Sequence, residues 1–305
     1  MTGSARWIAS RLRRRVGRSG VGSVRRMDLW QTELRDDGVF VAAYDNPPMN
    51  YFTGQATVEL GELLARWRDP DVKAVVITGA QPGKYITHYS VEELVQGSAH
   101  PEQLRRSFPE SIAAWHTLLQ NLTYLDKAVV AGITGDAGGG GLELSLNCDI
   151  RILQRGDFRV GFPECALGIL TGTGSQMLTK IIGHGRALDF LLRSRYVDPQ
   201  GALDLGIVSE LADDAKTRAI EVASGLARQA PAAVAAAKRC VVRGGNLPVA
   251  EGLRIEAEEW LKAGIEPKAL ELMQSYVDTP YEHRRAWIEE HGVWPDKDMA
   301  TGSRP

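Results

Sequence analysis

Two glutamates, each beside glycine-rich sequence, are the residues whose types and spacing could do chemistry in this chain. Glu143 ends the run Asp136-Ala-Gly-Gly-Gly-Gly-Leu-Glu143, and Glu164 follows 21 residues later in Val160-Gly-Phe-Pro-Glu164. Glycines allow backbone N–H groups to approach another group closely. Two carboxylates beside such donors suit acid/base chemistry next to a carbonyl, because one removes a proton, one delivers a proton and the N–H groups hold the enolate oxygen.

The glycine run joins an apolar strand to a helix that carries Leu144 and Leu146. A helix N-terminus favours negative charge, either a phosphate or an oxyanion formed during a reaction. A dinucleotide fingerprint would place glycine at the sixth position from Gly138, where Glu143 would instead repel a pyrophosphate. The sequence also lacks the Walker, G-x-S-x-G and H-E-x-x-H motifs, which disfavours the common NTPase, hydrolase and zincin classes. Taken alone, the glycine run could be only a tight turn, and Glu164 only a capping or solvated residue.

The elements that must position these glutamates alternate between strand and helix. Apolar runs predict strands, the first of which is closed by Pro47-Pro48, and apolar residues at helical spacing predict the helices between them. The predicted strands span 39–44, 73–78 and 127–134, and the predicted helices span 53–67 and 108–121. Repeated alternation of this kind indicates an α/β core.

The final third of the chain reads as helical. An alanine-rich helix is predicted over 213–243 and ends at Gly244-Gly245-Asn246; further helices are predicted over 249–262 and 267–277, with a short one through Trp287. The predicted organisation is therefore a basic extension over 1–27, an α/β core over 28–212 and a helical C-terminal region over 213–305.

Composition predicts a soluble globular protein without a global attraction to nucleic acid or membrane. The 305 residues are 44% hydrophobic with a formal net charge of −2. Cys148, Cys165 and Cys240 lack the spacing of a disulfide framework or zinc site, which favours a reducing compartment. No apolar run approaches the roughly 18 residues expected of a membrane-spanning helix. We therefore expect a cytoplasmic protein.

The first stretch of the chain differs in kind from the rest. Arginines occur there among serine and glycine, with no acidic residue before Asp28; they are Arg6, Arg11, Arg13, Arg14, Arg15, Arg18, Arg25 and Arg26. Self-repulsion predicts disorder. The stretch could be an organelle transit peptide, which would place the protein in an organelle matrix, a basic arm, or an extension upstream of a start at Met27.

The glutamate motifs resemble those of the enoyl-CoA hydratase/isomerase (crotonase) superfamily. The family pattern aligns without gaps and includes Gly-Gly-Gly-x-Glu-Leu, Cys-Asp, Phe-Gly-x-Pro-Glu, Leu-Gly-Ile and Gly-x-Gly. Here the matching text is Gly139–Leu144, Cys148-Asp149, Gly161–Glu164, Leu167–Ile169 and Gly172–Gly174. The likeness spans about residues 29–276 and implies an α/β spiral of ββα units with a C-terminal helical subdomain used in trimer assembly.

The resemblance also implies roles for individual residues. Glu143 and Glu164 would hold the water that adds to the double bond of an enoyl-CoA, and Glu164 would supply the proton that reaches the α-carbon. Gly140 and Tyr89 would supply the N–H groups of the oxyanion hole. The expected substrate-binding residues are Met49, Thr87, His88, Ser90, Val91, Gly139, Pro163 and Gly172. No metal or separate cofactor is implied, since coenzyme A is part of the substrate, and a homotrimer or dimer of trimers is expected.

Some positions depart from the family pattern. His88-Tyr89-Ser90 replaces the usual Gly-Ala-Asp, and Thr171 and Ser175 stand where proline and glycine are common. The ring of Tyr89 should reshape the acyl pocket. Retention of both glutamates favours hydration over the isomerase, decarboxylase and hydrolase reactions of the family. A nucleic-acid-binding homologue that uses the basic arm is the alternative from another class, disfavoured because the globular part is acidic.

Overall fold

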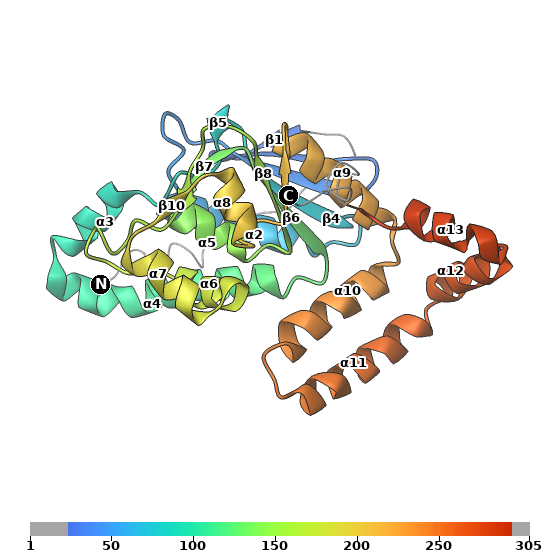
Figure 1. The fold of residues 1–305 in the computed structure, drawn as a ribbon. Helices are drawn as coiled ribbons and strands as arrows, with labels where there is room; N and C mark the ends of the chain where they lie inside the picture. Colours follow the sequence, from blue (N-terminus) through green and yellow to red (C-terminus); the bar gives the residue numbers. More distant parts are fainter. Residues whose placement is uncertain (1–23, 295–305) are drawn as a thin grey trace.

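The computed structural model describes residues 24–294, whose largest element is a seven-stranded sheet (Figure 1). The first three strands pair antiparallel and the others pair parallel. In spatial order the strands are β1 (Val24–Arg26), β2 (Trp30–Leu34), β3 (Val39–Tyr44), β4 (Ala74–Gly79), β6 (Ala128–Ile133), β8 (Ile150–Gln154) and β11 (Glu210–Ala212).

The three strands predicted from the sequence form the centre of this sheet. They correspond to β3, β4 and β6, and every residue in them is buried. Strands covered on both faces read as continuous apolar runs, and β-branched valine and isoleucine suit their pleated surface. The prediction over 127–134 is one residue too long at each end, since β6 begins at Ala128 and ends at Ile133.

A second sheet of four short strands lies beside the first. Its spatial order is β10 (Tyr196–Val197), β9 (Val160–Gly161), β7 (Gly135–Gly138) and β5 (Gly83–Lys84). The chain passes from β4 to β5, from β6 to β7 and from β8 to β9, and a helix follows each pair. Each strand-strand-helix unit thus gives one strand to each sheet, which confirms the predicted spiral of ββα units.

Helices cover these sheets and extend beyond them. They are α2 (Gly54–Arg66), α3 (Val91–Ser98), α4 (Pro101–Thr123), α5 (Gly140–Leu146), α6 (Gly174–Ile182), α7 (His184–Leu192), α8 (Pro199–Asp204), α9 (Ala215–Arg228), α10 (Pro231–Arg239), η1 (Cys240–Gly244), α11 (Val249–Gly264), α12 (Pro267–Asp278), η2 (Tyr281–His283) and α13 (Arg284–His291). The helix predicted over 108–121 begins earlier, at Pro101, and ends at Thr123. Proline is tolerated in the first turn because its missing N–H costs nothing there. Helix α3 was not predicted from the sequence.

The described structure corrects the predicted boundary between core and C-terminal helices. Helix α9 lies against the large sheet and buries Ala215, Ala219 and Val222 in a cluster with residues of β3, β4 and β6. A Cβ on Gly132 of β6 would lie 2.9 Å from Ala219 Cβ, so glycine permits the close approach of this helix. Residues 213–228 therefore belong to the core.

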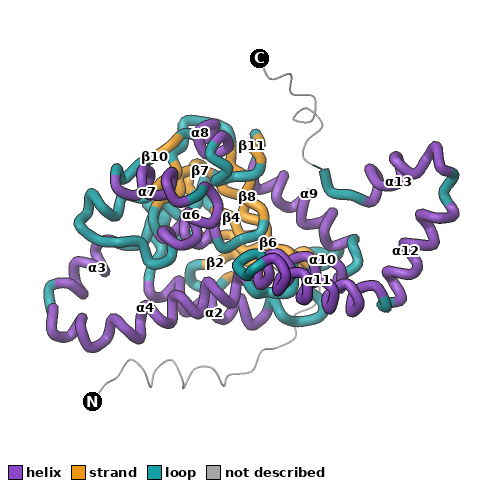
Figure 2. Tube along the Cα trace, turned by 60° about the horizontal axis from the view of Figure 1, so that its bottom comes forward, coloured by secondary structure: helices purple, strands orange, loops and turns teal. Residues whose placement is uncertain are grey.

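The helices that follow α9, namely α10 to α13, project away from the sheets (Figures 1 and 2). The single helix predicted over 213–243 is broken at Pro231, because proline lacks the N–H and disfavours helical conformation at Ala230, which is extended. Lys238 of α10 forms an ion pair with Asp149 at 2.8 Å, which ties this region to the core. No helix within residues 24–294 is long and apolar enough to cross a membrane.

The predicted basic extension overlaps the sheet at its end. Residues 24–26 form β1 and pair with β2, so within the described chain the boundary predicted at residue 27 moves back to β1. Backbone pairing, which arginine-rich composition does not reveal, is the reason. Residues 1–23 lie outside the described residues, and so do the alternatives proposed for that stretch.

Candidate active site

Glu143 lies in the first turn of α5, with only 2% of its surface exposed. One carboxylate oxygen, Oε2, accepts a hydrogen bond from Trp115 Nε1 at 3.0 Å. The other, Oε1, accepts one from the backbone N–H of Gly174 at 3.2 Å. Donors from two different helices therefore reach both oxygens of this side chain.

Glu164 follows Phe162 and Pro163 beyond the end of β9, and its side chain is also buried. Its Oε2 has no hydrogen-bond partner among the described residues. Burial raises the pKa of Glu164 to about 7, and the nearby charge of Glu143 raises it further. A carboxyl group in these surroundings keeps its proton to a higher pH than an ordinary glutamate does.

The backbone N–H groups of Tyr89 and Gly140 meet at one corner of the site. Phe52 N–H donates to the carbonyl of His88, and Ser90 N–H donates to the carbonyl of Phe52, both at 2.8 Å. This parallel bridge leaves the N–H of Tyr89 pointing away from Phe52. A Cβ built on Gly140 would lie 3.7 Å from Tyr89 N.

Gly140 is the first residue of α5, so its own N–H has no partner within the helix. Neither this N–H nor that of Tyr89 donates to an acceptor within residues 24–294. Two neighbouring donors without an acceptor can stabilise one oxygen that becomes negative during a reaction.

Gly139 and Gly172 adjoin the two carboxylates. Gly139 has a φ of +47°, and a Cβ there would lie 2.7 Å from Glu164 Oε1. A Cβ at Gly172 would lie 3.0 Å from Glu143 Oε2. A side chain at Gly139 would therefore displace Glu164 and adopt a strained φ, and one at Gly172 would displace Trp115 or Glu143.

The segment 87–91 connects this corner to the edge of the site. Thr87 Oγ1 donates to the carbonyl of Met49 at 2.6 Å, while Met49 itself is exposed. Ser90 is buried and caps α3 by accepting the N–H of Glu93, and Val91 begins that helix. The structure thus gathers Thr87 and Ser90 near the oxyanion corner and leaves the Met49 side chain at the surface.

The side chains of His88 and Tyr89 point into different contacts. The His88 ring stacks on Tyr51 with centroids 4.2 Å apart, and its Nδ1 contacts the carbonyl of Tyr89 at 2.6 Å. The Tyr89 hydroxyl donates to Glu93 of α3 at 2.8 Å, and Tyr89 Cβ lies 3.4 Å from a Cβ built on Gly140. The Tyr89 side chain therefore spans from the backbone of Gly140 to α3.

Sequence reasoning missed two neighbours of this site, Trp115 and His116 of α4. Trp115 contacts Glu143 as described above, and His116 Nε2 donates to the carbonyl of Gly172 at 2.8 Å. Their helix was predicted, but a tryptophan on a helix usually packs in the core, and neither residue belongs to the glutamate motifs. No local sequence signal linked α4 to Glu143.

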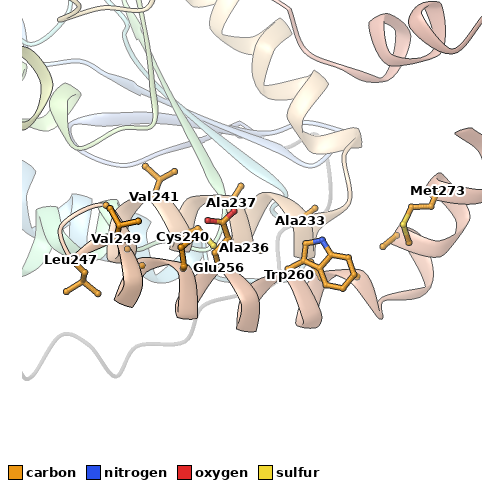
Figure 3. Close-up of a pocket in the computed structure, with 17 residues that line it drawn as sticks. Ala233, Ala236, Ala237, Cys240, Val241, Leu247, Val249, Glu256, Trp260 and Met273 are labelled. Carbon is orange, nitrogen blue, oxygen red and sulfur yellow. The ribbon is translucent and has the colours of Figure 1, made fainter.

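A separate cavity of about 740 Å³ lies among the C-terminal helices (Figure 3). Its lining comes from residues 233–273 and includes Leu253, Trp260 and Met273. The groups around the glutamates come instead from 87–89, 115, 139–143 and 161–174. This cavity is therefore not part of the carboxylate site.

Known proteins are similar to this chain in both sequence and fold. The model of the enoyl-CoA hydratase/isomerase family matches residues 35–284. A short-chain-enoyl-CoA hydratase of Clostridium acetobutylicum is 30% identical over 76% of this chain and 88% of its own length. The (E)-benzylidenesuccinyl-CoA hydratase of Thauera aromatica is 31% identical over 72% and 85%. A solved enoyl-CoA hydratase structure of Geobacillus kaustophilus superposes with a TM-score of 0.78 at 26% identity, covering 84% and 96%.

Proposed function

The chain belongs to the enoyl-CoA hydratase/isomerase family, and on that premise we propose that it reversibly adds water to a trans-2-enoyl-CoA. One observation carries the proposal: two buried carboxylates with unlike hydrogen bonding adjoin two neighbouring N–H groups. Double-bond isomerisation needs one group that moves a proton, whereas hydration needs a base for water and an acid for the α-carbon. Two glutamates in unlike surroundings therefore favour hydration.

In the proposed reaction, Glu143 acts as the ionised base. It removes a proton from water while the water oxygen bonds to the β-carbon of the enoyl group. The electron pair of the double bond moves toward the thioester oxygen, which accepts hydrogen bonds from the N–H groups of Tyr89 and Gly140. Glu164 then gives its proton to the α-carbon, so the pair of glutamates carries one proton before and after the addition.

The segment 87–91 and the carbonyl of Met49 would bind the coenzyme A portion beside this corner, with Gly139, Pro163 and Gly172 around the acyl group. The Tyr89 ring occupies space that the family's usual alanine leaves open, which favours a short acyl group or a planar one that stacks on the ring. The substrates named for the Clostridium and Thauera relatives, a short-chain enoyl-CoA and a benzylidenesuccinyl-CoA, are of these two kinds. No further cofactor enters the proposed reaction.

A panel of enoyl-CoA thioesters tests this proposal. Crotonyl-CoA, a long-chain enoyl-CoA and cinnamoyl-CoA are each incubated with the enzyme, and loss of enone absorbance is followed together with product mass. We expect products heavier by one water. A product of unchanged mass with a moved double bond would indicate an isomerase, while release of free coenzyme A or carbon dioxide would indicate a hydrolase or decarboxylase.

We also propose that the C-terminal helices join copies of this chain into a trimer or a dimer of trimers. Large apolar side chains are exposed along α11, α12 and the turn between them. They include Leu253, Trp260, Leu261, Ile265, Leu270, Met273 and Val277. Contiguous exposed apolar surface of this kind marks interaction sites. Sedimentation should show the assembly for the natural sequence and smaller species for Trp260→Asp; a monomer in both cases would contradict it.

A further inference from the structure

We propose that Trp115 is a positioning residue that holds the Glu143 carboxyl group correctly aimed at the water. This inference rests on the proposed hydratase function. The indole Nε1–H donates to Glu143 Oε2 at 3.0 Å, and Gly174 N–H donates to the other oxygen. Since an indole N–H can only donate, it favours the carboxylate form of its partner.

The backbone around this contact makes room for it. A Cβ at Gly172 would lie 2.8 Å from Trp115 Nε1 and 3.0 Å from Glu143 Oε2, so a side chain there would separate the indole from the carboxylate. His116, the next residue of α4, donates to the carbonyl of Gly172 at 2.8 Å. Consecutive side chains of one helix therefore fix both the carboxylate and the loop beside it.

The core also restrains the indole. The ring of Trp115 packs against Phe52, which is fully buried, with centroids 5.6 Å apart. Phe52 pairs through its backbone with the segment that carries the Tyr89 N–H. Trp115 and Phe52 thus link the proposed base, Glu143, to the backbone of Tyr89 in the proposed oxyanion corner.

A tryptophan that served only for packing would not need this hydrogen bond. Trp30 and Trp67 show this case, because both are fully buried and their Nε1 atoms have no partner among the described residues. Trp115 is only half-buried, yet its N–H is directed to a buried carboxylate. Trp67, which packs on Phe40, therefore provides a matched control for replacing an indole.

The first test compares Trp115→Phe with Trp67→Phe, with melting temperatures to check folding. Phenylalanine keeps an aromatic ring and removes the N–H. We expect Trp115→Phe to lower kcat by about 10- to 100-fold on every acyl group with little change in KM, the scale of one hydrogen bond to a charged group. Trp67→Phe should keep the natural kcat. An unchanged kcat in Trp115→Phe, or a loss confined to KM for certain acyl groups, would overturn the inference.

A double-mutant cycle tests whether Trp115 acts through Glu143. In a Glu143→Gln background, Trp115→Phe should cost much less than in the natural enzyme, because the group it positions is already altered. Equal losses in both backgrounds would show an independent role and contradict the inference.

A spectroscopic arm separates this inference from the proposed function. In protein labelled with 15N at the tryptophan indoles, the Trp115 resonance is assigned by its loss in Trp115→Phe. It should move strongly in Glu143→Gln and much less in Glu164→Gln. An unmoved resonance overturns the inference whatever the activity; a wild-type enzyme inactive on every enoyl thioester would instead remove the proposed function.

Discussion

The surroundings of Glu143 and of Glu164 differ although both side chains are almost equally buried, with 2% and 8% of their surface exposed. Glu143 sits in the first turn of a helix, and side-chain and backbone donors from α4 and α6 reach its two oxygens. Glu164 lies in a loop, and its Oε2 has no partner among residues 24–294. Burial alone therefore does not decide how well a carboxyl group is hydrogen-bonded.

What decides it is the number of donors that replace water. Removing a carboxylate from water without donors favours the neutral acid, whereas donors at both oxygens restore the ionised form. One site can thus hold a base and an acid of the same residue type.

Replacing either glutamate by glutamine should have the largest effect. Each change removes one proton-transferring group, so we expect kcat to fall by about 10²- to 10⁴-fold for Glu143→Gln and for Glu164→Gln. The double variant should lose much less than the product of both, since the two act on one water. Steady-state kinetics checks this, and near-normal turnover in both single variants would remove the two-glutamate mechanism.

The difference in protonation should appear in the pH profile. The pKa of Glu164 is about 7, and the proposed acid must carry its proton. We therefore expect kcat/KM for hydration to fall above about pH 7, by about 10-fold for each further pH unit. Profiles between pH 5 and 10 measure this, and a flat profile up to pH 9 would contradict the assignment of Glu164 as the acid.

Gly139→Ala should disturb Glu164 selectively. The added Cβ would lie 2.7 Å from Glu164 Oε1 and must also adopt a φ of +47°. We expect about a 10-fold or greater loss of kcat, because small misplacements of a catalytic group are costly. Gly206→Ala is the control, since its φ of +77° is also positive but nothing lies within 4 Å of the added Cβ. If both variants lost the same activity, backbone strain alone would be the cause.

Tyr89→Ala should change substrate preference. Removing a ring beside the oxyanion corner should shift the ratio of kcat/KM between short and long or ring-bearing acyl groups by roughly 10-fold or more. Turnover on the best substrate should remain measurable because the proposed oxyanion contact uses the backbone N–H. A uniform loss over all acyl groups would show that Tyr89 does not line the acyl pocket.

Glu164→Gln should stabilise the protein at high pH. The folded-state pKa of Glu164 is raised from 4.5 to about 7, so its contribution to stability is fully present below pH 4.5 and is lost as pH rises through about 7. We expect the variant to gain about 1–3 kcal/mol in free energy of unfolding at pH 8. The gain should vanish near pH 4. Denaturant titrations at both pH values check this, and equal stability at pH 8 would mean that Glu164 is solvated.

The sequence indicated Glu143, Glu164 and the adjoining glycines as candidate site residues because they lie in short, local motifs. The strands β3, β4 and β6 were predictable because burial on both faces leaves continuous apolar runs. Trp115 was not, since its contact with Glu143 joins residues 28 positions apart on different helices. The break at Pro231 could have been predicted from proline chemistry, but the alanine-rich composition on both sides masked it.

The mass spectrum of the product formed from crotonyl-CoA in H₂¹⁸O tests the central claim most directly. If Glu143 activates water and Glu164 protonates the α-carbon, the wild-type enzyme should form a 3-hydroxyacyl-CoA that carries one ¹⁸O at the β-carbon. Glu143→Gln and Glu164→Gln should each form little of it under the same conditions. A product without ¹⁸O at the β-carbon would contradict the claim. Equal amounts of labelled product from all three enzymes would contradict it as well.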